Sequence, residues 1–414
     1  MSSATEQYLE SMIASSEAVD VPTMVDYLIQ DSLARGASDI HIEPWEDMVG
    51  VRVRVNGILQ WLVGIPLEHQ SNIAGRFKVM ANLESHTTGL PQDGKAAPDN
   101  FGGVQLRVSI FPTVYGEKIV CRVFNPNSKV FDISKLGFDD ETLERFKELA
   151  AKPTGLMLLT GPTGSGKTTA IYAAIGYLLE KHGNAVAISS VEDPVEQNLD
   201  WVNQSTLNPA RGYNYPAALR SLMRQDPEII MVGEIRDEET AEIAINAGMT
   251  GHLVISTLHA NTTSGTFARL INMDIEPFLL ASTIIGVLGV RLLRTNCMHC
   301  SGPYTPDPAP LEQLRRFEGD EYLQAMLDQH GFYRGAGCSA CGNTGFSGRT
   351  SINELLVCTE PVREAVMQKR ASRDIQALAV QDGMRTLWDS GLQLVVDRKT
   401  TIEETLQKVA ADQV

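Results

Sequence analysis

The sequence predicts an α/β chain in which a small N-terminal α+β domain precedes a larger domain with a mostly parallel sheet. Between residues 38 and 125, apolar and polar residues alternate with the period of half-buried strands. Between 154 and 295, apolar strands alternate with helical patterns, which favours a parallel sheet with helices on both faces. We expect, in order, an arm (1–20), the α+β domain (21–128), a linker with a leading helix (129–153), the α/β core (154–295), a cysteine-rich segment (296–348) and a helical, solvated C-terminal region (349–414).

Composition and charge narrow the class of protein. The chain has 414 residues, 51 acidic against 35 basic, and a formal net charge of −16, which disfavours nucleic acid as the main partner. The first 20 residues have no apolar leader, and the longest apolar run, 278–290, is shorter than the roughly 20 residues that cross a bilayer. We expect a cytoplasmic chain with at most peripheral membrane association.

Local patterns assign the elements of the N-terminal domain. An amphipathic helix is expected from 21 to 35, ending at Gly36. Strands are expected at 51–56, 104–108 and 119–123, with a helix at 71–82. Residues 126–128 (Pro-Asn-Ser) then indicate a linker, and a charged amphipathic helix follows it.

A phosphate-binding loop opens the α/β core. The loop reads Gly161, Pro162, Thr163, Gly164, Ser165, Gly166, Lys167, Thr168, Thr169. An apolar strand, 156–159, precedes it and an amphipathic helix follows, which is the setting that aims backbone N–H groups and a helix N-terminus at a nucleotide triphosphate. Lys167 would reach the β- and γ-phosphates, and the Thr168 hydroxyl would ligate Mg²⁺. A chance match in a glycine-rich turn is the alternative, and the two correct flanks disfavour it.

Carboxylates follow two further core strands. The strand 229–232 leads through Gly233 to Glu234, which we place beside Mg²⁺ and the attacking water. The strand 185–191 leads to Glu192 and further acids, at the edge where parallel sheets bind ligands. Glu192 is the candidate base that orients or deprotonates the water, with a solvated acidic turn as the alternative.

Two histidines bracket the fourth core strand. His252 precedes the strand 253–256, and His259 follows it after Ser256 and Thr257. These groups could sense the γ-phosphate; the alternative is a structural role, which is the more frequent one for a lone histidine.

Four cysteines form two C-x₂-C pairs. Their members are Cys297, Cys300, Cys338 and Cys341. This pattern predicts a tetrahedral zinc site, which would stabilise a segment that has few apolar residues of its own. Disulfides are the alternative, which a reducing compartment disfavours. Cys121 and Cys358 are interpreted as structural.

Taken together, these motifs resemble the secretion ATPase superfamily, specifically the hexameric ATPases of type II secretion and type IV pilus assembly. The resemblance starts near residue 21 and extends to the C-terminus. It rests on residues 37–43 (ASDIHIE), 90–94, 107–109, the phosphate loop, 192–196, 224–227, 233–237, 250–252, 256–259, the four cysteines and 348–350. It implies a PAS-like N-terminal domain joined to a RecA-like ATPase domain, with the inserted Cys₄ zinc segment, a helical C-terminus and nucleotide between the two domains.

The resemblance also implies a function. ATP hydrolysis, with Mg²⁺, would move one domain against the other in a homo-hexamer at the cytoplasmic face of the inner membrane. That motion would drive an inner-membrane platform protein, and pilin-like subunits would join a filament. Glu234 and Glu192 would handle Mg²⁺ and water, and Arg107 and Arg122 are the candidate arginine fingers from the N-terminal domain. A pilus-retraction motor and a type IV secretion or conjugation ATPase are the alternatives.

Some features depart from the family pattern. Many members carry an additional domain before the motif that begins here at residue 37, so we expect that docking arm to be absent or supplied by another chain. Asn56 and Lys95 stand where relatives usually have Asp and Arg, and neither change is expected to abolish activity. Retraction motors generally lack the four cysteines, which favours extension or secretion. A nucleic-acid motor and a non-hydrolysing nucleotide-binding module are the competing classes.

Overall fold

The computed structural model describes residues 3–15, 18–98, 101–124, 132–183 and 185–409. The chain divides into two compact units, Met1–Lys129 and Val130–Val414, which are described separately. The predicted linker at 126–128 lies outside the described residues. Among the helices of the described segments, none is both long and apolar enough to cross a membrane.

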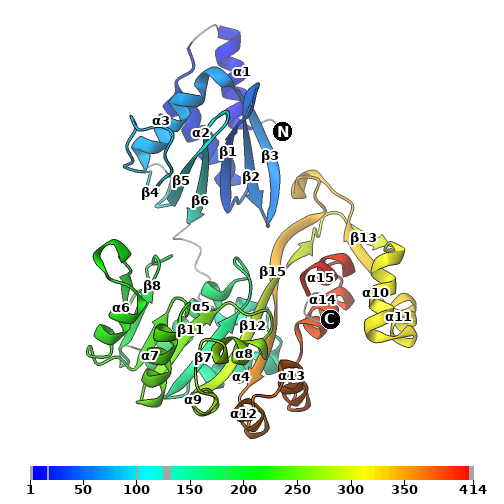
Figure 1. The fold of residues 1–414 in the computed structure, drawn as a ribbon. Coiled ribbons are helices and arrows are strands. Elements are labelled where there is room, and N and C mark those ends of the chain that lie inside the picture. The colour runs from blue at the N-terminus through cyan, green and yellow to red at the C-terminus, as the bar shows by residue number, and fades with distance from the viewer. Residues whose placement is uncertain (1–2, 16–17, 99–100, 125–131, 184, 410–414) are drawn as a thin grey trace. The chain divides into compact units, whose positions relative to one another are not determined.

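The N-terminal unit is an antiparallel sheet covered on one face by helices (Figure 1). The strand order is β3-β2-β1-β6-β5-β4, and every pairing is antiparallel. The strands are β1 (Asp39–Pro44), β2 (Met48–Val55), β3 (Ile58–Pro66), β4 (Gln92–Ala96), β5 (Gln105–Thr113) and β6 (Gly116–Phe124), and the helices are α1 (Ala4–Ser15), α2 (Val21–Ala34) and α3 (Gln70–Met80). The helices predicted at 21–35 and 71–82 and the three predicted strands are confirmed.

Alternation along these strands explains the one-sided core. Ile40 and Val53 are fully buried and pack with Leu28 of α2 and Phe77 of α3, while their chain neighbours His41 and Arg52 lie on the opposite face of the sheet. Helix α1, in the predicted arm, packs on α2, and Asp31 accepts hydrogen bonds from the backbone at its start. The arm is therefore part of the unit.

The second unit contains a seven-stranded sheet in the order β15-β12-β7-β11-β10-β8-β9. Its strands are β7 (Gly155–Thr160), β8 (Ile188–Glu192), β9 (Val202–Thr206), β10 (Ile229–Val232), β11 (Leu253–Leu258), β12 (Ile284–Asn296) and β15 (Phe346–Val357). The pairings are parallel except that between β12 and β15. The largely parallel sheet and its four predicted strands are confirmed.

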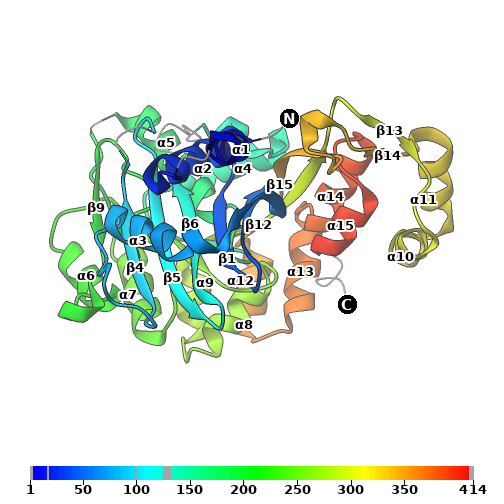
Figure 2. The same ribbon diagram turned by 90° about the horizontal axis from the view of Figure 1, so that it is seen from above.

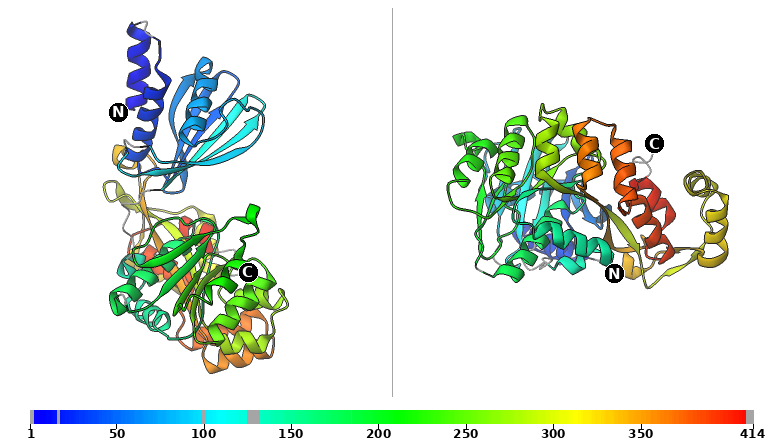
Figure 3. Two further views of the ribbon diagram at one scale, coloured as in Figure 1. Left: turned by 90° about the vertical axis from the view of Figure 1, so that its left-hand side faces the viewer. Right: turned by 90° about the horizontal axis from the view of Figure 1, so that it is seen from below.

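Helices cover both faces of this sheet (Figures 1 and 3). They are α4 (Asp140–Ala150), α5 (Lys167–His182), α6 (Tyr215–Leu222), α7 (Glu238–Met249), α8 (Gly265–Ile271), α9 (Pro277–Thr283), α12 (Glu360–Met367) and α13 (Ser372–Gln381). On β7, Leu156 and Leu158 pack into the core that includes α7, whereas Met157 and Leu159 pack into the core that includes α5. All of β7 is buried, as expected of a central parallel strand.

A third core includes Leu293, near the C-terminal end of β12, and Ile352 of the paired strand β15. Figure 2 shows α10, α11, α14 and α15 near the two-stranded sheet of β13 and β14. These elements are β13 (Ser301–Tyr304), α10 (Pro308–Glu318), α11 (Asp320–Ala325), a π-helix (Met326–His330), β14 (Phe332–Gly335), α14 (Leu387–Val396) and α15 (Ile402–Val409). Leu314 and Phe332 of the cysteine segment are buried with Leu392 and Leu406 of the C-terminal helices.

This third core corrects the expectation of a helical, solvated C-terminal region. Residues 349–357 are strand, and α14 and α15 bury one face each. The reason is that apolar residues of the cysteine segment, too few for a core of their own, share one with these helices.

Candidate active site

The phosphate loop follows the carboxyl end of β7 and leads directly into α5, which begins at Lys167. Its glycines meet specific backbone needs. Gly164 and Gly166 have φ of 75° and 99°, a left-handed conformation that other residues rarely adopt. A methyl group on Gly161 would come within 2.5 Å of the Val290 carbonyl oxygen of β12. The loop is therefore closely packed on β12 and fixed in shape.

Lys167 lies over its own loop. Its ammonium donates to the carbonyl oxygens of Gly161, at 2.6 Å, and Pro162, at 3.1 Å. Burial lowers the pKa of Lys167, the nearby Glu234 charge opposes this change, and the Arg291 charge adds to it. Thr168 is half-buried in the first turn of α5 and Thr169 is exposed, while Pro162, Thr163 and Gly164 of the loop are exposed. Ser165 is buried, and its hydroxyl has no hydrogen-bond partner among the described residues.

Glu234 is the centre of a charged network. One carboxylate oxygen accepts a hydrogen bond from Arg236 Nε at 2.7 Å, and the other lies 3.1 Å from His259 Nε2. Arg236 also lies 3.7 Å from a carboxylate oxygen of Asp193, which follows β8. The carboxyl ends of β8, β10 and β11 thus bring together groups that the sequence analysis assigned to the site, including His259.

Glu192 is buried more deeply than the sequence analysis anticipated, with 3% of its surface exposed. Its carboxylate accepts hydrogen bonds from Tyr172 at 2.5 Å, Ser190 at 2.6 Å and Gln204 at 3.1 Å. Three donors offset the cost of burying a charged group. The alternative of a solvated acidic turn is therefore wrong for Glu192.

His252 occupies the opposite end of the strand from His259. β11 runs parallel to β7, so His252 lies beside Gly155, where β7 begins, whereas the phosphate loop follows the end of β7. Its Nδ1 lies 3.0 Å from the Ala247 carbonyl oxygen; since a carbonyl only accepts, Nδ1 carries the hydrogen. The structure therefore does not bring His252 to the phosphate loop of its own chain.

The hydroxyls between the two histidines have structural partners. Ser256 Oγ donates to the Val232 carbonyl at 2.9 Å, and Thr257 Oγ1 donates to the Gly233 carbonyl at 2.8 Å. They fix β11 against the end of β10, and so set the position of Glu234 relative to His259.

Arg107 and Arg122 are neighbours on the exposed face of the N-terminal sheet. They form a cross-strand pair between β5 and β6, and Lys95 of β4 lies opposite Arg107. Arg122 is 58% exposed and pairs with Asp39 at 3.3 Å. Both guanidinium groups lie on the side of the sheet away from its core.

Arg291 of β12 is a residue that the sequence analysis missed. It is 6% exposed, donates to the carbonyl oxygens of Val290 and Asn261, and lies beneath Gly161. On the same side, the Thr160 hydroxyl exchanges hydrogen bonds with the backbone of Ala260. Both contacts join the phosphate loop to the loop after β11. A charged residue directly after the apolar run 278–290 was the available signal.

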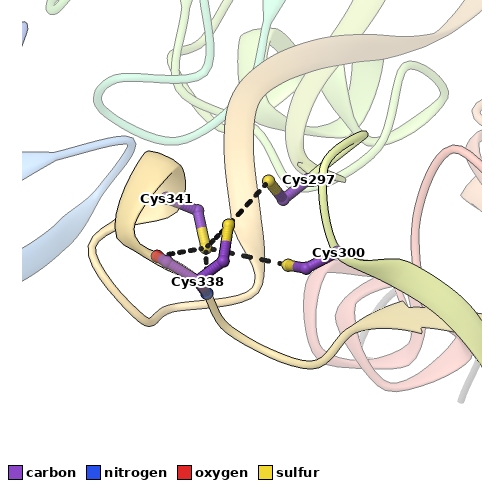
Figure 4. A group of neighbouring side chains, drawn as sticks. All are labelled: Cys297, Cys300, Cys338 and Cys341. Atoms are coloured by element: carbon purple, nitrogen blue, oxygen red, sulfur yellow. Dashed lines mark hydrogen bonds between the residues drawn. The ribbon is translucent and has the colours of Figure 1, made fainter.

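The four cysteines converge at one point (Figure 4). The first pair lies in the turn between β12 and β13, and the second in the turn between β14 and β15. Their sulfur atoms all lie within 4.8 Å of one another, and three sulfur–sulfur distances are 3.8 to 3.9 Å. A tetrahedral zinc site with Zn–S bonds of about 2.3 Å requires about 3.8 Å between sulfurs.

The pKa values of two thiols of the tetrad shift in opposite directions, and burial raises that of Cys300 to about 12. The cysteines are free, so the disulfide alternative is not supported. Burial raises the pKa of Cys341, but hydrogen bonds from the backbone N–H groups of Cys338 and Gly345 outweigh burial and lower it to about 6. The sulfur–sulfur distances make the tetrad compatible with zinc.

The fold and the loop define the class of protein: a P-loop NTPase with a mixed α/β fold. Comparison with known proteins places it more closely. A family model described as "Type II/IV secretion system protein" matches residues 14–407. The chain belongs to this family.

Curated relatives cover nearly the whole chain. It is 39% identical over 98% of its length to the "Type IV pilus assembly ATPase PilB" of Myxococcus xanthus, covering 70% of that protein. It is 40% identical over 96% of its length to the "Type II secretion system protein E" of Xanthomonas campestris pv. campestris, covering 69% of that protein.

Solved structures support the fold. The Legionella pneumophila ATPase DotB superposes with a TM-score of 0.69 at 19% identity, covering 94% of this chain and 96% of that one. The pilus retraction motor PilT gives a TM-score of 0.63 at 23% identity, covering 95% of this chain and 97% of that one. At these identities the likeness is one of fold alone.

Proposed function

We propose that this ATPase drives type IV pilus assembly or extension of a type II secretion pseudopilus. The observation that carries the proposal is a complete phosphate loop, with Glu234 near enough for its charge to act on Lys167, in a chain about 40% identical to relatives named for those two processes. Retraction is not favoured, because the relatives that are about 40% identical to this chain are named for assembly and secretion. The retraction motor PilT is only 23% identical.

In this proposal the described side chains divide the chemistry. Residues 161–169 hold the nucleotide, and Lys167 leaves its loop carbonyls to pair with the β- and γ-phosphates. Thr168 and Glu234 would ligate Mg²⁺ or position its water, and His259 lies next to Glu234. Glu192 orients or deprotonates the attacking water, for which one of its three hydrogen bonds must be exchanged for one with the water. Zinc is held by the four cysteines and has a structural role.

The N-terminal unit would complete the site. We interpret it as the PAS-like domain of the family, and its cationic pair Arg107 and Arg122 would supply arginine fingers when it closes on bound ATP. The working form would be a homo-hexamer at the cytoplasmic face of the inner membrane, acting on an inner-membrane platform protein. Nucleic acid is not an expected partner, since the net charge is −16.

The first test concerns turnover. In Lys167→Ala, ATP hydrolysis should fall by at least about 100-fold, because the cation that faces the transferring phosphate is lost. Steady-state phosphate release measures this, and unfolding in urea confirms that the variant is folded. Lys181→Ala, at the other end of α5, is the matched control and should keep full activity. Parent-level turnover in Lys167→Ala would reject the site.

The second test concerns the machinery. The full chain is used as bait on native membranes with a non-hydrolysable ATP analogue, and Lys167→Ala is the control bait. Recovery of a polytopic membrane protein with pilin-type partners supports the assembly motor. Recovery of DNA or conjugation proteins instead would overturn that part of the proposal and leave the ATPase site unchanged.

A further inference from the structure

Tyr215, the first residue of α6, places a hydroxyl group at the carboxyl edge of the sheet. Its side chain is 94% enclosed and packs in the core that contains Val191 and Val232, the last apolar residues of β8 and β10. A methyl group on Gly233 would come within 2.7 Å of the hydroxyl oxygen. The hydroxyl therefore lies over the residue that connects β10 to Glu234.

The hydroxyl is surrounded by the charged groups of the site. Burial raises the pKa of Tyr215; the Asp193 charge adds to the rise, Arg236 opposes it, and Glu234 and Glu192 add smaller amounts. The phenol is therefore protonated at any working pH. Glu234 is in turn near enough to Lys167 for its charge to act on that ammonium. The hydroxyl thus belongs to the same cluster as the phosphate-binding lysine.

Within the described part of the chain, the Tyr215 hydroxyl has no hydrogen-bond partner. It also does not belong to the fully enclosed polar atoms that lack a partner. Its ring is fixed by the core, while its oxygen is not completely enclosed. The other tyrosines of this region differ: Tyr172 donates to Glu192, and Tyr213 shares a hydrogen bond with Ser205 at 2.7 Å. A fixed, unpaired donor and acceptor at this position is suited to bind a water molecule.

We propose that Tyr215 is a further water-positioning residue for ATP hydrolysis. Carboxylates only accept hydrogen bonds and arginine only donates, whereas a phenol does both. The Tyr215 oxygen accepts one hydrogen of the attacking water and gives its own hydrogen to a neighbouring carboxylate. The water oxygen then bonds to the γ-phosphorus, the bond from that phosphorus to the ADP oxygen breaks, and the second water hydrogen passes as a proton to a carboxylate of the site.

The proposal rests on the nucleotide site described above, and the decisive variant is Tyr215→Phe in the full chain. It removes one oxygen and keeps the buried ring. We expect kcat to fall about tenfold with KM for ATP within about twofold, because the group acts on the water and not on nucleotide binding. Tyr213→Phe also removes a phenol oxygen, but one bonded to Ser205, and should retain parent kcat.

A second measurement isolates the hydroxyl from the fold. Gly233→Ala should displace the hydroxyl and lower kcat. In a Tyr215→Phe background, the same substitution should lower kcat by a clearly smaller factor. There the nearest neighbours of the added methyl group are the Val191 oxygen at 3.3 Å and Glu192 Cα at 3.4 Å. Parent kcat in folded Tyr215→Phe, or strictly additive effects in the double variant, would overturn the proposal. A parent protein without Lys167-dependent hydrolysis would instead reject the ATPase site itself.

Discussion

At the level of single residues, the two glutamates that we propose to act in catalysis occupy different environments. Glu192 is buried and accepts three hydrogen bonds from uncharged groups of the protein. Glu234 is 18% exposed and interacts with Arg236 and His259. A buried carboxylate with three hydrogen bonds stabilises the fold, whereas an ion pair whose arginine is 57% exposed contributes less to stability.

Replacing each carboxylate by an amide should separate these contributions. Glu192→Gln replaces one carboxylate oxygen by an NH₂ group, which then faces either the donor Tyr172 or the donors Ser190 and Gln204. We therefore expect loss of turnover and a decrease of about 1–3 kcal/mol in the free energy of unfolding. Glu234→Gln should lower kcat by at least about 100-fold but change that free energy by less than about 1 kcal/mol. Phosphate release and urea unfolding measure both, with the exposed Glu242→Gln as control. Equal stability losses would contradict the distinction.

At the level of elements, Glu354 joins three segments. It lies in β15, is 3% exposed, and accepts hydrogen bonds from the N–H and hydroxyl of Thr263, at 3.0 and 2.8 Å, and from the N–H of Leu387, at 3.3 Å. Leu387 is the first residue of α14, and Thr263 lies just before α8. The N-terminus of α14 and the donors before α8 stabilise the buried charge.

Removing Glu354 should therefore loosen the loop that carries His259. In Glu354→Ala, the N–H groups of Thr263 and Leu387 lose their acceptor, and we expect the free energy of unfolding to fall by about 2–4 kcal/mol. Urea unfolding followed by circular dichroism measures this. Glu312→Ala, whose carboxylate is 69% exposed and pairs with Arg315, should change it by less than about 0.5 kcal/mol. Similar losses in the two variants would contradict the role of Glu354.

The same elements explain what the sequence could predict. Strands β7, β8, β10 and β11 were predictable because short apolar runs led into glycine, a carboxylate or, for β11, hydroxyl residues and His259. Edge strand β9 was missed, since Val202–Thr206 is polar and half-exposed. Strand β12 was missed because, buried on both faces, it lacks alternation. The partners of Glu192 were also out of reach: Tyr172 and Gln204 come from separate elements, and only the fold brings them together.

At the level of the whole second unit, the cysteine tetrad and the C-terminal helices form one structure with β12. Asn296, immediately before Cys297, donates to the carbonyl oxygens of Tyr333 and Arg398, and its N–H donates to Lys399. Glu404 of α15 is buried against Arg294 of the same strand. Since β12 also carries Val290 and Arg291 beneath the phosphate loop, this strand connects the two sites.

Loss of the metal should therefore affect this core more than nucleotide binding. We expect about one zinc per chain, and Cys338→Ser should lose it, because a tetrahedral Cys₄ site needs all four thiolates. In that variant, limited proteolysis should cut between residues 297 and 345 while the affinity for ADP stays within about threefold, since β7 and α5 pack in separate cores. Cys121→Ala, outside the tetrad, should keep its zinc and its resistance to protease.

Metal analysis, proteolysis and ADP titration on the same preparations test these expectations. A metal-free parent that resists protease would contradict the site, and ADP affinity lost together with zinc would contradict the separation of the cores.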